Sequence, residues 1–179
     1  MFEAGNLLYF KPFIFKNGAL PKNKFMVVLG QDANGNTLLA SLPTSKDHVP
    51  GDIEVKGGCI DLPKRQVNVF VFSAGENITI AQAGTDSFAF GVNTFVYGSD
   101  LDTYPVTMFH QQMEAHLSDV ELIGQITEDY FIALKECLKN SSIVKNKYKR
   151  ILGCAFTDNT HVLLLYSPNS RRIKNRNLL

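Results

Sequence analysis

The sequence predicts a mainly β protein with a few helices, in the α+β class. Short apolar runs separated by glycine, proline and asparagine fill the first two-thirds of the 179 residues, which is typical of short strands and turns. Helical periodicity appears only later and is clearest over residues 128–140. With 45% apolar residues, the chain is long enough to form a core of its own.

A long β-hairpin is the most marked local pattern. FMVVLG (25–30) is strongly apolar and β-branched, and NTLLASLP (36–43) has the composition of its returning strand. Between them, Asn34-Gly35 suits the positive φ of a tight hairpin turn. A first strand over residues 7–10, continued irregularly to residue 15, precedes the hairpin.

Further short strands follow, each bounded by turn residues. We expect them at 53–55, 66–75, 77–82 and 87–98, and as a final hairpin at 151–156 and 160–167. This number of short strands favours a small barrel or a sandwich. After the last strand the chain ends in a polar, basic tail.

Two helices are expected in the last third of the chain. Thr127 is a favourable N-cap for a helix over 128–140, whose first turn is acidic, as the helix dipole prefers. One face of this helix is apolar at helical spacing, through Phe131, Leu134 and Leu138. A second helix is predicted over 105–117, where the periodicity is weaker.

Charge is distributed unevenly along the chain. Residues 1–134 carry 8 Lys/Arg and 15 Asp/Glu, a net charge of −7, whereas residues 135–179 carry 10 and 2, a net charge of +8, and the sum is +1. A basic end on an acidic body suits an anionic partner such as nucleic acid. The alternative is a solvated tail that balances the charge of the body.

The three cysteines, Cys59, Cys137 and Cys154, predict unpaired thiols in a reducing compartment. No signal peptide is recognised at the start, and no uncharged apolar run approaches the roughly 18 residues of a membrane span. We therefore expect a cytoplasmic protein that does not enter the membrane. His110 and His116 lack metal-ligand spacing for a helix, so no metal site is predicted.

Four segments in order, spread over residues 5–135, resemble one known family. They are Gly5-Asn6-Leu7-Leu8-Tyr9-Phe10, Lys24-Phe25-Met26-Val27-Val28-Leu29, Ala40-Ser41-Leu42-Pro43-Thr44-Ser45 and Leu122-Ile123-Gly124-Gln125-Ile126-Thr127-Glu128. The chain resembles a divergent member of the MazF/PemK toxin endoribonucleases. The resemblance implies an SH3-like barrel over 1–150 with an insertion near 75–120 and a C-terminal helix, and leaves 151–179 as a β extension and tail.

The resemblance also implies an activity. Family enzymes cleave single-stranded RNA without metal or cofactor, using the RNA's own 2′-hydroxyl as the nucleophile. They usually form homodimers and are blocked by an antitoxin protein. Carried over to this chain, the catalytic residues are Lys24, Thr44 and Ser45, to which we add His48 because it is the only imidazole nearby and imidazoles commonly act as acids and bases in catalysis.

Single-stranded RNA also favours basic grooves with aromatic platforms. KPFIFK (11–16) alternates basic and aromatic residues near the predicted hairpin. The candidate RNA-binding residues are Lys11, Phe13, Lys16, Lys22 and Lys46. The alternative is that the phenylalanines belong to the core and the lysines are solvated.

Two functions therefore stay open. Lys24 stands where the family has an arginine, and lysine lacks the planar fork with which arginine grips a phosphate. The chain is then either an active endoribonuclease or a non-catalytic PemK-like barrel that binds protein or nucleic acid. In structural terms alone, Lys24 would be a surface lysine, Thr44-Ser45 a turn pair and His48 an exposed loop histidine.

Overall fold

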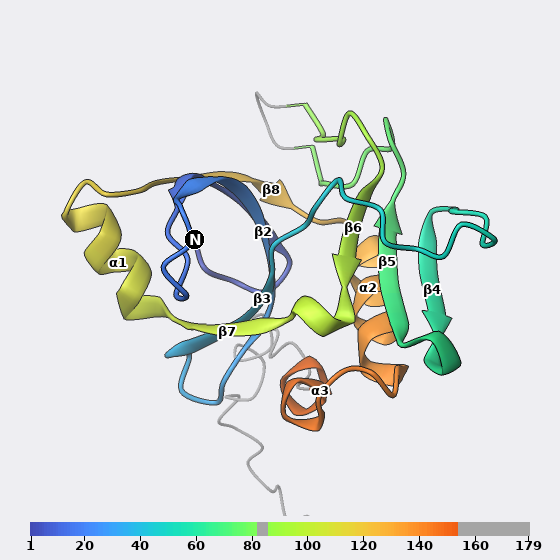
Figure 1. Ribbon diagram of the computed structural model, residues 1–179. Coiled ribbons are helices and arrows are strands. Elements are labelled where there is room, and N and C mark those ends of the chain that lie inside the picture. Colours follow the sequence, from blue (N-terminus) through green and yellow to red (C-terminus); the bar gives the residue numbers. More distant parts are fainter. Residues whose placement is uncertain (82–85, 154–179) are drawn as a thin grey trace, which may run out of the picture.

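The computed structural model describes residues 1–81 and 86–153 (Figure 1). Within these ranges the protein has eight strands in two antiparallel sheets and three α-helices, so the mainly β, α+β class is confirmed. The strands of the described residues form two separate ladders and no closed barrel. None of the described helices is both long and apolar enough to cross a membrane.

The larger sheet has five strands. In spatial order they are β7 (Asp102–Pro105), β3 (Thr37–Ser41), β2 (Lys22–Gln31), β1 (Asn6–Phe13) and β8 (Asp119–Gln125). In Figure 1, β8 crosses the top of this sheet and β7 returns along the bottom, so the sheet curves around the N-terminal segment. β2 and β3 form the predicted hairpin, with Gly35 at φ +69° in its turn.

The smaller sheet has three strands and is covered by helices. Its strands are β4 (Gly58–Leu62), β5 (Val67–Phe72) and β6 (Thr94–Tyr97), in that order, with short 3₁₀ turns at η1 (Pro63–Arg65) and η2 (Gly98–Asp100). The helices of the protein are α1 (Val106–Glu114), α2 (Glu128–Asn140) and α3 (Asn146–Gly153). α2 packs against β4 and β5, and α3 packs against α2 and β2 (Figure 1).

The core explains why the predicted hairpin is so apolar. A central cluster between the two sheets and the helices includes Leu29 of β2, Phe70 of β5 and Leu134 of α2. A second cluster, on the other face of the five-stranded sheet, includes Val28 of β2 and Phe109 of α1. Because β2 is buried on both faces, it reads as a continuous apolar run rather than an alternating one.

Several predicted elements need correction. Residues 53–55 are not a strand, and of the strand expected at 77–82 the described residues 77–81 contribute only isolated bridges at Asn77 and Thr79. Residues 151–153 were expected to begin a strand but complete α3, because Tyr148 and Leu152 give this segment a helical apolar face. The rest of the predicted C-terminal hairpin lies outside the described residues. The helices expected at 105–117 and 128–140 are confirmed as α1 and α2.

The cysteine prediction is also wrong for two of the three thiols. Cys59 on β4 and Cys137 on α2 form a disulfide, with their Cα atoms 5.5 Å apart. It ties the edge strand of the small sheet to the helix that covers it. The two residues are 78 positions apart, so their pairing depends on the tertiary fold and leaves no local signal. The argument for a reducing compartment from unpaired cysteines therefore no longer holds.

Gly98 offers a test of the packing between the start of η2 and the buried polar residue Asn68. A Cβ added at Gly98 would overlap the side-chain oxygen of Asn68 and lie 2.8 Å from Cγ2 of Val144. Asn68 cannot move away easily, because its amide donates to the backbone oxygen of Cys137 at 3.2 Å. We expect Gly98→Ala to lower the free energy of unfolding by about 1–3 kcal/mol in urea denaturation. Gly51→Ala is the control, since a Cβ there meets nothing within 4 Å, and equal stability of the two variants would contradict this packing.

Candidate functional site

A groove of about 710 Å³ opens between the start of β2, the segment after β3 and residues 88–94. It is therefore built from both halves of the molecule, since residues 88–94 lead into β6 of the smaller sheet. Five of the residues singled out from the sequence line it, namely Lys22, Lys24, Thr44, Ser45 and Lys46.

The hairpin leads Lys24 and Thr44 to the same groove. Val27 on β2 lies opposite Ser41 on β3 in an antiparallel ladder. Lys24 lies three residues before Val27 on β2, and Thr44 lies three residues after Ser41, beyond the end of β3. Lys24 and Thr44 both line the groove, as the hairpin pattern in the sequence predicts.

Thr44 is fixed by a two-way bridge to the other sheet. Its backbone N–H donates to the carbonyl of Phe95 at 3.0 Å, and the N–H of Phe95 donates back to the carbonyl of Thr44 at 2.8 Å. The residue before it, Pro43, is buried. The segment after β3 is therefore a junction between the sheets, which holds the Thr44 side chain at the groove.

The loop after Thr44 is held by two further groups. The Thr44 hydroxyl oxygen accepts the backbone N–H of Lys46 at 3.2 Å, which leaves its hydrogen able to donate to a ligand. The Tyr97 hydroxyl donates to the carbonyl of Lys46 at 3.1 Å and accepts the N–H of His48 at 2.7 Å. Burial raises the pKa of Tyr97, so this hydroxyl keeps its proton.

His48 does not line the groove. It is exposed, and its ring lies 5.7 Å from the ring of Tyr97, outside the groove lining. The loop thus directs Thr44, Ser45 and Lys46 to the groove and carries His48 past it. The structure gives no support for His48 as the proton acceptor predicted from the sequence.

Aromatic rings form one wall of the groove. The Phe25 ring is central to this wall, with its centroid 4.6 Å from that of Tyr9, 5.4 Å from that of Phe88 and 5.2 Å from that of Phe90. Phe90 is buried and supports the others, whereas Tyr9, Phe25 and Phe88 are partly exposed. Their ring edges and faces provide an apolar surface beside the lysines.

The groove is positively charged. Three lysines line it, and no Asp or Glu is among the described residues of its lining. The pKa of Lys24 is lowered from its ordinary value of 10.5, first by burial and then by repulsion from Lys22 and Lys46. Each lysine therefore lies within electrostatic reach of Lys24, and an anion bound among them would relieve the repulsion.

The other predicted RNA-binding residues lie elsewhere. Phe13 is only 1% exposed in the second cluster, so it cannot stack on a ligand, and the core interpretation of this phenylalanine holds. Lys11 pairs with Glu121 at 2.6 Å, and Lys16 pairs with Asp102 at 2.9 Å. The segment 11–16 is thus engaged with its neighbours and does not contribute to the groove lining.

Sequence reasoning missed the aromatic wall. Phe88 and Phe90 alternate in SFAF, a pattern that equally describes an ordinary half-buried strand. Only the packing of residues 88–94 over the start of β2 gives these rings a place in the groove. Within residues 1–81 and 86–153, no group of three or more His, Cys, Asp or Glu side chains is arranged to hold a metal ion.

Comparison with known proteins adds no relative. No family model, curated protein or solved structure matches this chain. The function must therefore be argued from the groove itself and from the resemblance in the four sequence segments.

The lowered pKa of Lys24 predicts a stability change with a definite sign. Because folding lowers this pKa below 10.5, the protonated amine destabilises the folded state at neutral pH. Lys24→Met keeps the apolar stem and removes the charge, so we expect a higher melting temperature at pH 7. The gain should shrink as pH rises from the folded-state pKa toward 10.5, since the folded wild type then releases its proton first.

The control for this experiment is Lys64→Met, at an exposed lysine of η1 outside the groove lining. Thermal unfolding followed by circular dichroism at several pH values measures both variants. A Lys24→Met protein that is less stable than wild type at pH 7 would show that the amine is not under the repulsion inferred here.

Proposed function

We propose that the groove binds single-stranded RNA and cleaves it without metal, through attack by the RNA's own 2′-hydroxyl. The observation that carries the proposal is that Lys24 and Thr44 line the same groove, which also has an aromatic wall and a lysine rim formed by Lys22 and Lys46. Single-stranded nucleic acids are bound by this combination, because cations hold the backbone and rings stack with bases.

The lysine rim suits the phosphate at the cleavage point. Lys22 and Lys46 are exposed on the rim, where flexible ammonium groups can reach the non-bridging oxygens. The Thr44 hydroxyl, held by the bridge to Phe95, is a preorganised donor to the same oxygens. Donors fixed before the reaction stabilise the charge that develops on the pentavalent phosphorus at little reorganisation cost.

Lys24 is the group best suited to take the 2′-hydroxyl proton. A lysine whose pKa is lowered by burial and by neighbouring cations acts more readily as a base. Only the fraction of Lys24 that has lost its own proton can accept another, and the lowered pKa enlarges that fraction. In the proposed step the proton moves from the 2′-oxygen to the neutral Nζ of Lys24, the 2′-oxygen forms a cyclic phosphate, and the bond to the 5′-oxygen breaks. A rim lysine in its protonated form, Lys22 or Lys46, then supplies a proton to the leaving 5′-oxygen.

The MazF/PemK resemblance is consistent with this reaction. The four matching segments include β1, the start of β2, the end of β3 with Thr44, and the entry to α2. We extend the proposal to an SH3-like PemK ancestry for the fold, to a homodimer and to an antitoxin partner that blocks the groove.

A second candidate function is binding without turnover. Two observations favour it: a lysine stands at the family's arginine position, and His48 lies outside the groove lining. Without an arginine or an imidazole in the groove lining, only lysines remain to accept and donate the protons of the reaction. The protein would then hold RNA as a non-catalytic module.

Replacement of the Thr44 hydroxyl separates the two candidates. Thr44→Val keeps the shape and the backbone bridge, and we expect it to cut single-stranded RNA about 100-fold more slowly in EDTA, because one fixed donor is lost. Thr44→Ser should retain most of the activity. Rates are measured by gel electrophoresis of labelled RNA, and the product end is examined for a 2′,3′-cyclic phosphate.

A substrate with a single 2′-deoxynucleotide at the cleavage point is the chemical control, since it lacks the nucleophile. RNA that stays intact at high concentrations of wild-type protein, yet binds to it, would rule out cleavage and leave the binding module. Failure of RNA to bind at all would rule out both candidates.

Phe88 tests the aromatic wall independently of the chemistry. Base stacking on a protein ring is worth about 1–3 kcal/mol, so we expect Phe88→Leu to weaken binding of single-stranded RNA about 5- to 100-fold. Phe88→Tyr should bind as wild type because it keeps the ring. Fluorescence anisotropy with a 2′-O-methyl oligonucleotide, which cannot be cleaved, gives the dissociation constants. Equal affinity of the Leu and Tyr variants would mean that the wall does not stack with bases.

A further inference from the structure

α3 carries a basic face that the groove does not use. We propose that this face, formed by Lys145, Lys147, Lys149 and Arg150, binds the phosphate backbone of a nucleic acid. The proposal is independent of cleavage in the groove. It concerns a second contact surface of the same protein.

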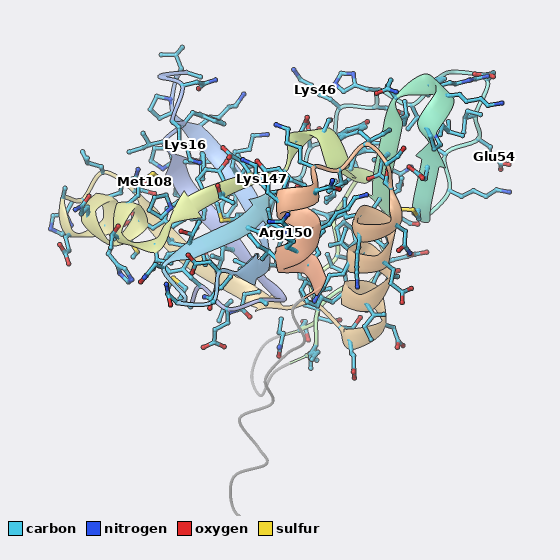
Figure 2. The ribbon with its side chains drawn as sticks, turned by 90° about the horizontal axis from the view of Figure 1, so that it is seen from below. Lys16, Lys46, Glu54, Met108, Lys147 and Arg150 are labelled. Atoms are coloured by element: carbon cyan, nitrogen blue, oxygen red, sulfur yellow. A yellow bond between two sulfur atoms is a disulfide. The ribbon has the colours of Figure 1, made fainter. Side chains whose placement is uncertain are left out.

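α3 separates apolar from basic side chains. Tyr148 and Leu152 are buried in the central cluster, and Ile151 packs partly against it. On the other side, Lys147 and Arg150 are exposed and three residues apart, so they lie on one face of the helix. Figure 2 shows these two residues on α3, with Lys46 of the groove apart from them.

The charge of this region is entirely of one sign. Residues 137–153 contain five basic residues and no acidic one, whereas residues 1–134 carry a net charge of −7. Within residues 1–81 and 86–153, no ion pair joins a carboxylate to Lys145 or Lys147, whose ammonium groups lie 5.9 and 4.7 Å from the Tyr148 ring centroid. The buried Tyr148 ring thus supports two exposed cations.

These lysines also oppose the local preference of the helix. The first turn of α3 contains no acidic residue, and Lys145 and Lys147 lie at this end. The helix dipole makes a cation at a helix N-terminus unfavourable, whereas an acidic residue at the same position stabilises the helix. A bound anion would offset this unfavourable interaction, because it would be attracted both by the lysines and by the positive end of the helix dipole.

The chemistry of the face favours nucleic acid over the other anionic partners. A protein partner normally needs an apolar centre in its interface, and a membrane-bound helix needs an exposed apolar face. None of the exposed large apolar residues of the described chain lies on α3, because its apolar side is already buried. Exposed lysines with no exposed large apolar residue beside them on the helix suit a phosphate backbone, which is recognised mainly through its charge.

α3 and the groove lie at different ends of β2. Ile151 of α3 packs beside Gly30, whereas Lys24 lies at the groove, and the six steps along the strand from Lys24 to Gly30 span about 20 Å. The two surfaces can therefore be tested by separate variants. The α3 face and the groove could bind two parts of one long nucleic acid or two separate molecules.

The test compares two double variants that each remove two positive charges. Lys145→Gln/Lys147→Gln alters the α3 face, and Lys56→Gln/Lys64→Gln alters exposed lysines elsewhere. We measure binding of a 20-nucleotide RNA, single-stranded or in a duplex, by anisotropy at several salt concentrations. The α3 variant should bind about tenfold more weakly at 0.1 M salt, and its single-strand salt slope should fall by about 1.4, which is two lost phosphate contacts. The control should match wild type.

Circular dichroism confirms that each variant is folded before binding is compared. An α3 variant with the affinity and salt slope of the control would overturn the proposal, as would wild-type protein that binds anionic lipid vesicles or an acidic polypeptide but no RNA. Groove variants separate this result from the proposed function. If Lys22→Gln/Lys46→Gln binds RNA as wild type while the α3 variant is weakened, the groove proposal fails and the α3 proposal stands.

Discussion

The groove depends on one pair of backbone hydrogen bonds, between Thr44 and Phe95. Before this bridge, the chain belongs to the five-stranded sheet, and after it the chain leads toward the smaller sheet. The bridge is made by backbone atoms, so it does not consume the Thr44 hydroxyl. It brings a strand end beside residues 88–94, and the wall and rim of the groove follow from that approach. Substitutions that keep the Thr44 backbone can therefore change the chemistry of the groove without dismantling it.

The groove also shows a conflict between stability and the binding proposed for it. Burial and two neighbouring lysines lower the pKa of Lys24, and a folded protein gains nothing from such crowding of like charges. Proteins tolerate unfavourable arrangements of this kind mainly where a ligand relieves them. The first turn of α3 repeats the pattern, with lysines where the helix dipole favours acidic residues. Both arrangements support the anionic ligands proposed above, at surfaces built from different elements.

Local patterns predicted the parts of this protein that local physics controls. The β2–β3 hairpin and α2 follow from apolar periodicity and turn residues, and the hairpin leads Lys24 and Thr44 to one groove. The Cys59–Cys137 disulfide could not be predicted, because it depends on how α2 packs under β4. The place of Phe88 in the groove wall could not be predicted either, since a phenylalanine in an alternating segment can face a core or a groove. The error at 151–153 arose because ILGCAF has strand composition, whereas burial of Leu152 beside Tyr148 favours a helix.

The ion pairs explain how an acidic body can present a basic groove. Residues 1–134 contain eight basic residues, and four of them form ion pairs, namely Lys11, Lys16, Lys56 and Arg65. Three of the other four line the groove, where the described lining holds no carboxylate. Net charge therefore misleads about this region, because the acidic residues pair with cations elsewhere and the described groove lining keeps three lysines and no carboxylate. Local pairing, rather than the total of +1, decides where a polyanion can bind.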